Sequence, residues 1–413
     1  MSANRTFSLS EASALFKIKY GKLSENVYNS SNVLLGRVKK SYNFTGKQIL
    51  HSIPQSFAGG VGSGSLPVAN TAQYAEAVIQ AKKVYAVVEI DRESIKASMS
   101  DEGAFVRATK EVVQKGVESW MRNMSRILFS DGSGKLAIGK DAGPDVTGLG
   151  TLASPFILTL AAATKEANIE ERDLVNVDAE TSELEVLEYD PSTQVIKLVG
   201  SSATLSALVA GTNPFAAANS LYMQGSANND PEGLYGVLRA TSGSKYGISI
   251  ARRWKAHQID ASAATISSAL MNKAMLAVEK KTGKTPNLII TSYKQFEKLL
   301  NIFEDDKRYP IPNRAGVTDK AGAVISFSGI QFMSTSGPVP VVAERFCEDD
   351  TMYFLNDNFI EIYHRPDFGW FDDDGTVFLR KASSDEYEAR YGGYLQVYID
   401  PNFHAVIYGL STT

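Results

Sequence analysis

Three neighbouring stretches decide the fold: VLLGRVKKSYNF (Val33–Phe44), the glycine-rich FAGGVGSGSL (Phe57–Leu66) and AVIQAKKVYAVVEI (Ala77–Ile90). Two extended runs around a glycine-rich segment predict a long hairpin with a flexible tip. Each run carries a lysine pair, Lys39-Lys40 and Lys82-Lys83. A two-stranded ribbon of this length is marginal in water unless something covers it. Because no neighbouring segment offers a third strand, we expect another copy of the protein to cover it.

A long amphipathic helix is predicted over Asp101–Asp131. Its N-terminus carries Ser100 and Glu102, and Gly132 and Gly134 follow its end, as expected for a helix with defined start and stop signals. Its apolar residues recur at helical spacing: Phe105, Ala108, Val112, Val113, Val117, Trp120, Met121, Met124, Ile127 and Leu128. At 1.5 Å per residue this helix would be roughly 45 Å long, which is typical of a structural spine.

The composition fits a globular protein of two or three lobes. The chain has 413 residues, of which 44% are hydrophobic and 21% charged. Its net charge of −4 excludes a general nucleic-acid binder held by a large positive field. The single cysteine, Cys347, excludes an internal disulfide, and no secretory signal or membrane-spanning stretch is evident. We therefore expect a protein that is made or assembled in the cytosol.

Residues 146–235 have a different character. Short β-like runs (Asp173–Val177, Glu183–Tyr189, Gln194–Val199, Ser220–Gln224) alternate with turn residues, which predicts a small β-barrel or hairpin module inserted into a larger domain.

A mixed α/β region follows the module. A helix is predicted over Ser262–Thr282, followed by Gly283. A buried strand, Asn287–Thr291, leads into a capping box at Ser292–Gln295 and a helix at Tyr293–Phe303. Further strands are predicted at Val324–Met333, Val339–Ala343, Met352–Leu355, Phe359–His364, Tyr394–Ile399 and Ala405–Leu410.

No catalytic constellation is present. The four histidines, His51, His257, His364 and His404, show no pair at metal-ligand spacing. Asp131–Lys135 resembles the end of a phosphate loop, but Leu136 replaces the required Ser or Thr. The run Asp372-Asp373-Asp374 reads better as a solvated turn than as a metal site. We expect no enzymatic activity, metal or cofactor.

The charge distribution indicates contacts between copies. Residues 36–90 carry six basic and two acidic side chains, whereas residues 342–390 carry thirteen acids and five Lys or Arg. We expect the basic arm of one copy to lie on the acidic region of the next, unless the two surfaces are independently solvated. The candidate contact residues are Arg37, Lys39, Lys40, Lys82, Lys83, Asp372, Asp373 and Asp374.

This order of parts resembles the major capsid protein of tailed bacteriophages, the Hong Kong 97-type fold. Local support comes from NLIITS (Asn287–Ser292) before a capped helix, and from YEARYGGY (Tyr387–Tyr394) followed by YIDP (Tyr398–Pro401) and AVIY (Ala405–Tyr408). The resemblance implies an α+β fold with a small inserted β-rich module. It divides the chain as follows: an N-terminal arm (1–35), an E-loop (36–90), a P-domain with the spine helix (91–145), the insert (146–235), an A-domain (236–345), P-domain return strands (346–395) and a C-terminal A-domain strand (396–413).

The resemblance also implies a function and partners. The protein would form hexamers and pentamers of an icosahedral or prolate shell around double-stranded DNA, in the virion capsid, after assembly in the host cytoplasm. Its partners would be a separate scaffolding protein, a portal protein, and in some cases a decoration protein, with no membrane. Two alternatives stay open: an encapsulin-type compartment shell, and a hydrolase or carbohydrate-binding protein whose site is built from loops.

Overall fold

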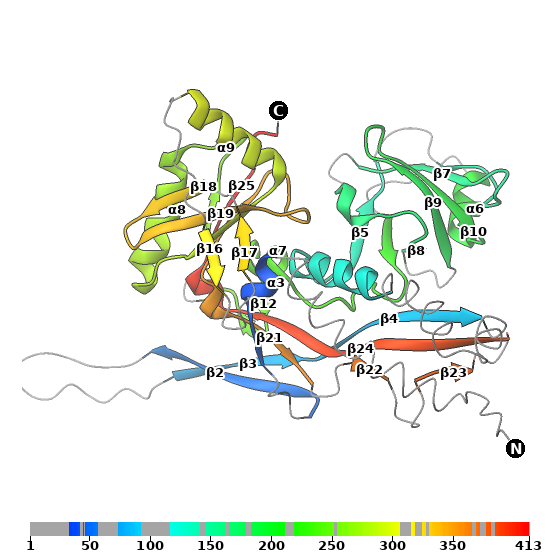
Figure 1. The fold of residues 1–413 in the computed structure, drawn as a ribbon, viewed down its shortest axis with the longest axis horizontal. Coiled ribbons are helices and arrows are strands. Elements are labelled where there is room, and N and C mark those ends of the chain that lie inside the picture. The colour runs from blue at the N-terminus through cyan, green and yellow to red at the C-terminus, as the bar shows by residue number, and fades with distance from the viewer. Residues whose placement is uncertain are drawn as a thin grey trace, which may run out of the picture.

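In the computed structural model the chain forms three sheets that carry most of its core (Figure 1). The structure describes residues 33–41, 44, 46–56, 73–91, 116–140, 146–161, 165–178, 183–210, 219–251, 254–305, 315–318, 324–327, 330–365, 369–371, 377–380 and 385–412. We call the sheets the basal sheet, the upper sheet and the insert sheet. The basal sheet extends beneath the insert, and the upper sheet lies beside the insert (Figure 1).

The predicted hairpin exists, but its strands are not the predicted ones. β2 (Gln48–Ser56) pairs with β3 (Gln73–Gln80) in an antiparallel two-stranded ribbon. The run Val33–Phe44 instead forms the short helix α3 (Val33–Arg37) and the strand β1 (Lys39–Ser41). Helix formation buries three successive apolar side chains of α3, which a strand would place on opposite faces. The glycine-rich tip lies outside the described residues.

The basal sheet shows why the second predicted run is split. β4 (Lys82–Asp91) leaves the hairpin at Ala81 and pairs with the fourteen-residue β24 (Glu386–Ile399), from Lys82 opposite Leu395 to Asp91 opposite Glu386. On its other side β24 pairs with three strands: β21 (Ile360–His364), β22 (Gly369–Trp370) and β23 (Leu379–Arg380). β1 adds to β21 in parallel. Strands that are remote in sequence therefore pair with both ends of the segment that was expected to be arm, and β2 and β3 between them stay a two-stranded ribbon.

The spine helix is described as helical over residues 116–128, and its predicted beginning, 101–115, lies outside the described residues. Trp120, Met121, Met124 and Ile127 are buried, which matches the predicted apolar stripe. The Trp120 ring meets Tyr391 of β24 edge-on at 5.4 Å. A Cβ on Gly116 would lie 2.4 Å from Val88 Cγ2, so the helix approaches β4 closely. The spine helix thus packs directly on the basal sheet.

The upper sheet has the strand order β14-β25-β20-β15-β19-β18. Its strands are β14 (His257–Asp260), β25 (Ala405–Tyr408), β20 (Met352–Leu355), β15 (Leu288–Thr291), β19 (Gly337–Ala343) and β18 (Ile330–Ser334). Alternate residues of β15 face two different cores: Ile289 packs with the helices, and Leu288 and Ile290 pack toward the basal side. Helices α8 (Ser268–Thr282) and α9 (Tyr293–Asp305) therefore cover one face of the sheet.

The helix predicted over Ser262–Thr282 begins later than expected, at Ser268, because Ser267 caps it by accepting a hydrogen bond from Leu270 N. Its end is as predicted, with Gly283 at φ 69°. At α9, Ser292 Oγ accepts from Gln295 N at 3.3 Å. The Gln295 amide does not return to the cap; it donates to the carbonyls of Asp349 and Ser411, at 2.9 and 2.8 Å. The expected reciprocal capping box is therefore only half formed, because Gln295 instead ties α9 to two loops.

The insert is a seven-stranded antiparallel sheet with its own core. Its strands, in spatial order, are β5 (Lys135–Ile138), β11 (Ser220–Met223), β8 (Leu174–Val177), β9 (Leu184–Asp190), β10 (Val195–Gly200), β7 (Phe156–Thr159) and β6 (Val146–Thr147). A bridge between Gly139 and Leu160 joins the ends of β5 and β7, so the sheet curls toward a barrel. The helix α6 (Ala203–Ala210) and the turn η1 (Glu166–Asn168) complete it. Its sheet begins at Lys135, earlier than the predicted boundary.

Short elements connect these sheets. They are α7 (Leu234–Leu238), the hairpin β12 (Ser244–Lys245) and β13 (Ile248–Ser249), the hairpin β16 (Ala315–Thr318) and β17 (Val324–Phe327), and the turns η2 (Asp357–Phe359) and η3 (Pro401–Phe403).

Candidate assembly surface

The β2–β3 hairpin is fixed at its base and exposed along its side. Ala77 and Ile79 are fully buried in the main core, and Val78 N donates to Tyr246 O at 2.8 Å. By contrast, Leu50 and Tyr74 are 54% and 60% exposed. Large apolar side chains on a two-stranded ribbon gain stability when another surface covers them. The exposed side of the hairpin is therefore a candidate docking surface, although its base is better supported than the sequence suggested.

The candidate lysines do not lie on the hairpin. β2 and β3 contain one charged side chain between them, Glu76. Lys39 and Lys40 lie on β1, and Lys82 and Lys83 lie on β4, so the two pairs belong to separate strands of the basal sheet. The picture of a lysine-bearing arm is therefore wrong for the described hairpin strands. Pairing with β21 and β24 places these lysines on the body of the protein.

Two of the candidate cations already have acidic partners in the same chain. Arg37 Nε lies 2.8 Å from Asp357 Oδ2, with both side chains mostly buried. Lys39 Nζ lies 2.8 Å from Glu361 Oε1, and this hydrogen bond helps lower the pKa of Glu361 against the opposing effect of burial. Lys82 Nζ donates to Asn228 O at 3.4 Å, and Lys83 Nζ sits 5.9 Å from the centre of the Tyr394 ring. Asp372, Asp373 and Asp374 lie outside the described residues.

A groove of about 840 Å³ separates the basal sheet from the insert. Its floor includes Tyr85 and Val87 of β4, which are 56% and 44% exposed. Leu174 of β8 lines it from the insert side, and Lys83 and Arg172 give it basic groups. This groove combines exposed apolar side chains with positive charge. It can receive an extended apolar segment with a small negative charge.

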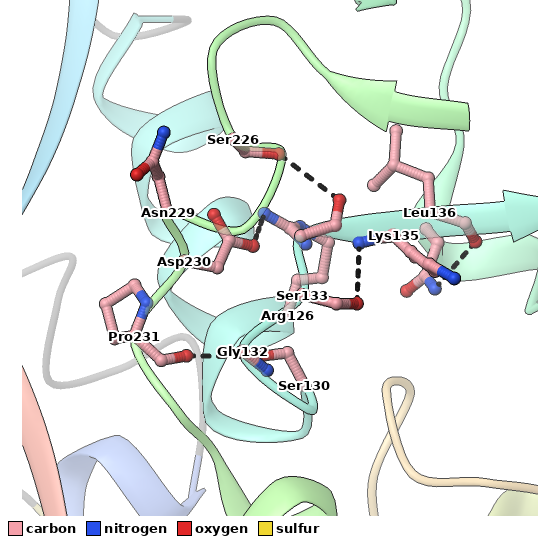
Figure 2. Close-up of polar contacts among 12 residues, drawn as sticks. Arg126, Ser130, Gly132, Ser133, Lys135, Leu136, Ser226, Asn229, Asp230 and Pro231 are labelled. Carbon is pink, nitrogen blue, oxygen red and sulfur yellow. Dashed lines mark hydrogen bonds and ion pairs between the residues drawn. The ribbon is translucent and has the colours of Figure 1, made fainter. Parts of the chain in front are cut away.

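The junction between the spine helix and the insert is tightly built (Figure 2). The insert's first strand and its exit segment meet here: Asn228 N donates to Ser133 O at 2.7 Å, and Ser226 Oγ donates to Gly134 O at 3.2 Å. Gly134 has φ +78°, and a Cβ there would lie 2.2 Å from Ser226 O. Only glycine accommodates both that backbone and that contact. The segment that leads into the insert and the segment that leads out of it therefore lie side by side.

A buried ion pair holds this junction. Arg126, near the end of the spine helix, faces Asp230 of the exit segment at 2.8 Å, and their side chains are only 6% and 8% exposed (Figure 2). One helical turn earlier, Arg122 pairs with Glu170 and Asp173 of the insert. The sequence did not predict that either arginine contacts the insert, because its charged residues at four-residue spacing, among them Glu118 and Arg122, indicate an ordinary exposed helix face. The apolar run directly after Arg126, Ile127–Phe129, was the available signal that it is buried.

The insert also contacts the upper part of the molecule. Lys165 Nζ bonds Glu348 Oε1 at 2.6 Å and Phe346 O at 2.8 Å. Beside them Glu344 is nearly buried, and burial raises its pKa to about 7. Burial likewise raises the pKa of the Cys347 thiol well above its ordinary value, which agrees with an unreactive structural cysteine. This loop is a structural contact and offers no nucleophile.

The described residues contain no group of three or more His, Cys, Asp or Glu that could hold a metal ion. His404 is fully buried, where burial lowers its pKa to about 3, and its Nδ1 accepts a hydrogen bond from Asn356 N. Of the helices in the described part of the chain, none has the length and apolar character needed to cross a bilayer.

Comparisons with known proteins agree with this architecture. Residues 211–370 match the family model of the SU10 major capsid protein. The cyanophage A-1(L) capsid subunit has a similar structure, with TM-score 0.50 and 11% identity over 94% of this chain and 93% of that one. The predicted resemblance to major capsid proteins of tailed phages is confirmed. So is the Hong Kong 97-like fold with an inserted β-rich module.

Two further phage structures align over most of the chain. A protein of Mycobacterium phage Bobi gives TM-score 0.42 at 10% identity, covering 97% of this chain and 98% of that one. The Myoviridae phage XM1 capsid protein gives 0.43 at 7% identity, covering 92% and 91%. No curated protein matches the sequence. The family match supports a structural shell protein.

Proposed function

We propose that this protein is the repeating subunit of a tailed-phage shell that encloses double-stranded DNA, and that it has no enzymatic activity. The observation that carries the proposal is the capsid-family match over residues 211–370, which runs from the insert through the upper sheet into the basal sheet. The similarity of fold to the cyanophage capsid subunit, over 94% of this chain, agrees with it.

The parts of the fold have assigned roles in this proposal. The β2–β3 hairpin is the E-loop, the basal sheet and the spine helix form the P-domain, and the upper sheet with α8 and α9 forms the A-domain. The exposed side of the hairpin, with Leu50 and Tyr74, is covered by a neighbouring subunit in hexamers and pentamers. Because these two side chains are already nearly half-buried, covering the rest contributes on the order of 1 kcal/mol each.

The groove beside the insert is the receiving surface in this proposal. Its exposed Tyr85, Val87 and Leu174 supply apolar contact, and its basic groups suit Glu76, the one charged residue of the described hairpin strands. Contacts of the hairpin are therefore mainly apolar and backbone-mediated. Lys40, Lys82, Lys83 and Asp372–Asp374 remain candidates for additional contacts between subunits.

The shell subunit assembles in the host cytoplasm with a separate scaffolding protein and a portal protein, and in some cases a decoration protein. Sedimentation and electron microscopy of the full chain, expressed with and without its scaffolding protein, test the proposal. We expect closed particles, or rings of five and six subunits. Monomers and dimers under every condition would contradict it, and particles that exclude DNA and enclose a cargo enzyme would indicate a compartment shell.

A further inference from the structure

Helix α8 presents a row of lysines on its exposed side. The helix packs on the upper sheet through Met271, Ala274, Met275 and Val278. Figure 1 shows it on the side of that sheet away from the insert. The exposed positions include Lys273 and Lys280, and Lys284 follows just after the Gly283 cap. At 1.5 Å per residue these lysines are spaced by about 10 Å and 6 Å along the axis.

No acidic side chain is interleaved on this face. The one acid of α8, Glu279, is half-buried and accepts a hydrogen bond from Thr335 Oγ1 at 2.8 Å. Among the residues that the structure describes, Lys273, Lys280 and Lys284 form no ion pair. Beneath them, His257 has a lowered pKa, chiefly through burial and then through the charges of Lys273 and Lys281. The face is positive on a chain whose net charge is −4.

Helix stability explains only part of this pattern. Lysines at a helix C-terminus interact favourably with the helix dipole, and Lys280 and Lys281 lie in the last turn. That effect falls off within the last turn, whereas Lys273 lies two turns earlier. Lys281 also has a local role, because it donates to Lys255 O at 2.7 Å and Asn402 Oδ1 at 2.8 Å. Neither the helix dipole nor a local contact accounts for Lys273, Lys280 and Lys284 as one row.

We propose that the lysine row Lys273, Lys280 and Lys284 is a binding surface for the phosphate backbone of duplex DNA. Duplex DNA carries one charge per roughly 1.7 Å of its axis, so cations spaced along a rigid helix meet phosphates without sequence selection. A protein partner would instead be expected to use the apolar side chain on this face, Leu276, which is 51% exposed. The inference rests on the proposed function, because the enclosed genome supplies the DNA, and it places α8 on the inner side of the shell.

The test measures binding of the full chain to a fluorescent 20-base-pair duplex between about 50 and 200 mM salt, the range over which phosphate contacts lose affinity steeply. The variant K273Q/K280Q/K284Q removes the row and keeps Lys281. The matched control, K135Q/K140Q/K197Q, removes the same charge from the insert. L276A tests apolar docking. All of these side chains are at least partly exposed, so circular dichroism should be unchanged.

We expect the salt slope, log K against log salt concentration, to fall by about 0.9 for each lost phosphate contact, or roughly 2.7 for the α8 triple variant. The insert control and L276A should keep the parental slope. Equal losses in both triple variants, no DNA binding by the parent, or loss of binding in L276A would each overturn the proposal. Particle formation is scored separately by sedimentation. Shells that form normally with unchanged DNA binding in the α8 variant overturn this inference alone, and failure of the parent to form shells overturns the proposed function.

Discussion

Removing the carboxylate of Asp230 should destabilise the protein more than any surface substitution. Asp230 is 8% exposed, and it is the acid that faces the buried Arg126 at 2.8 Å. In the part of the chain that the structure describes, Arg126 Nε and Nη1 have no hydrogen-bond partner, so little else compensates the guanidinium. Leaving one charge of a buried pair alone costs about 3–5 kcal/mol. We expect D230A to lower the free energy of unfolding by that amount.

Equilibrium unfolding in guanidinium chloride, followed by tryptophan fluorescence, measures this loss of stability. Trp120 lies buried in the same helix as Arg126, so its signal reports on the junction. The matched control is E188A, which breaks the exposed pair between Glu188 and Lys197, 2.6 Å apart and 54% and 36% exposed, and should cost under about 1 kcal/mol. The double variant R126M/D230L replaces both charges with apolar groups and should recover most of the loss.

Two results would refute the reasoning. If D230A costs no more than E188A, the junction admits enough water to solvate Arg126. If R126M/D230L costs as much as D230A, the loss comes from altered packing and not from an isolated charge.

Three further predictions concern the insert, the loop beside it and the lysines. Replacing residues 136–224 with a short Gly/Ser linker should leave a soluble, folded subunit, because the chain enters and leaves the insert at Ser133 and Asn228, which are hydrogen-bonded to each other. Removing residues 146–235 also deletes Asp230, so that deletion should give insoluble protein. Equal solubility of the two deletions would contradict this prediction. Burial raises the pKa of Glu344 from 4.5 to about 7. Between these pH values the folded protein binds more protons than the unfolded chain, so the free energy of unfolding should fall by about 3 kcal/mol as the pH rises from 4.5 to 7. E344Q should abolish this slope in unfolding measured from pH 4 to 8, and a slope that persists would assign it to another group. Changing Lys40, Lys82 and Lys83 to glutamate should leave circular dichroism unchanged but raise the concentration needed for particles in sedimentation; particles that form as readily as the parent's would mean that these lysines only solvate the basal sheet. Lys39 is left unchanged in this variant because its loss would also break the pair with Glu361.

The sequence predicted the elements whose signals are local. The helix stop at Gly283, the cap at Ser292 and the buried strand predicted at Asn287–Thr291 were found because each depends on a few adjacent residues, whereas the start of α8 at Ser268 was not predicted. Four strands of the insert, β8 to β11, were likewise predicted from short β-like runs between turn residues, whereas β5, β6 and β7 were not. The order of these elements was sufficient to indicate a capsid fold.

Strand pairing and burial of charge were decided only by the tertiary structure. The run Ala77–Ile90 was predicted as one extended strand, yet its halves pair with β2 (Gln48–Ser56) and with β24 (Glu386–Ile399), because an extended stretch of sequence does not specify which strand it pairs with. The lysine pairs therefore lie on the body of the protein and not on the predicted arm, and Lys39 forms an ion pair with Glu361 there. Arg126 has the same chemistry as any helical surface arginine. Its structural role depends on the tertiary structure, because the segment that leaves the insert places Asp230 against it and buries both side chains.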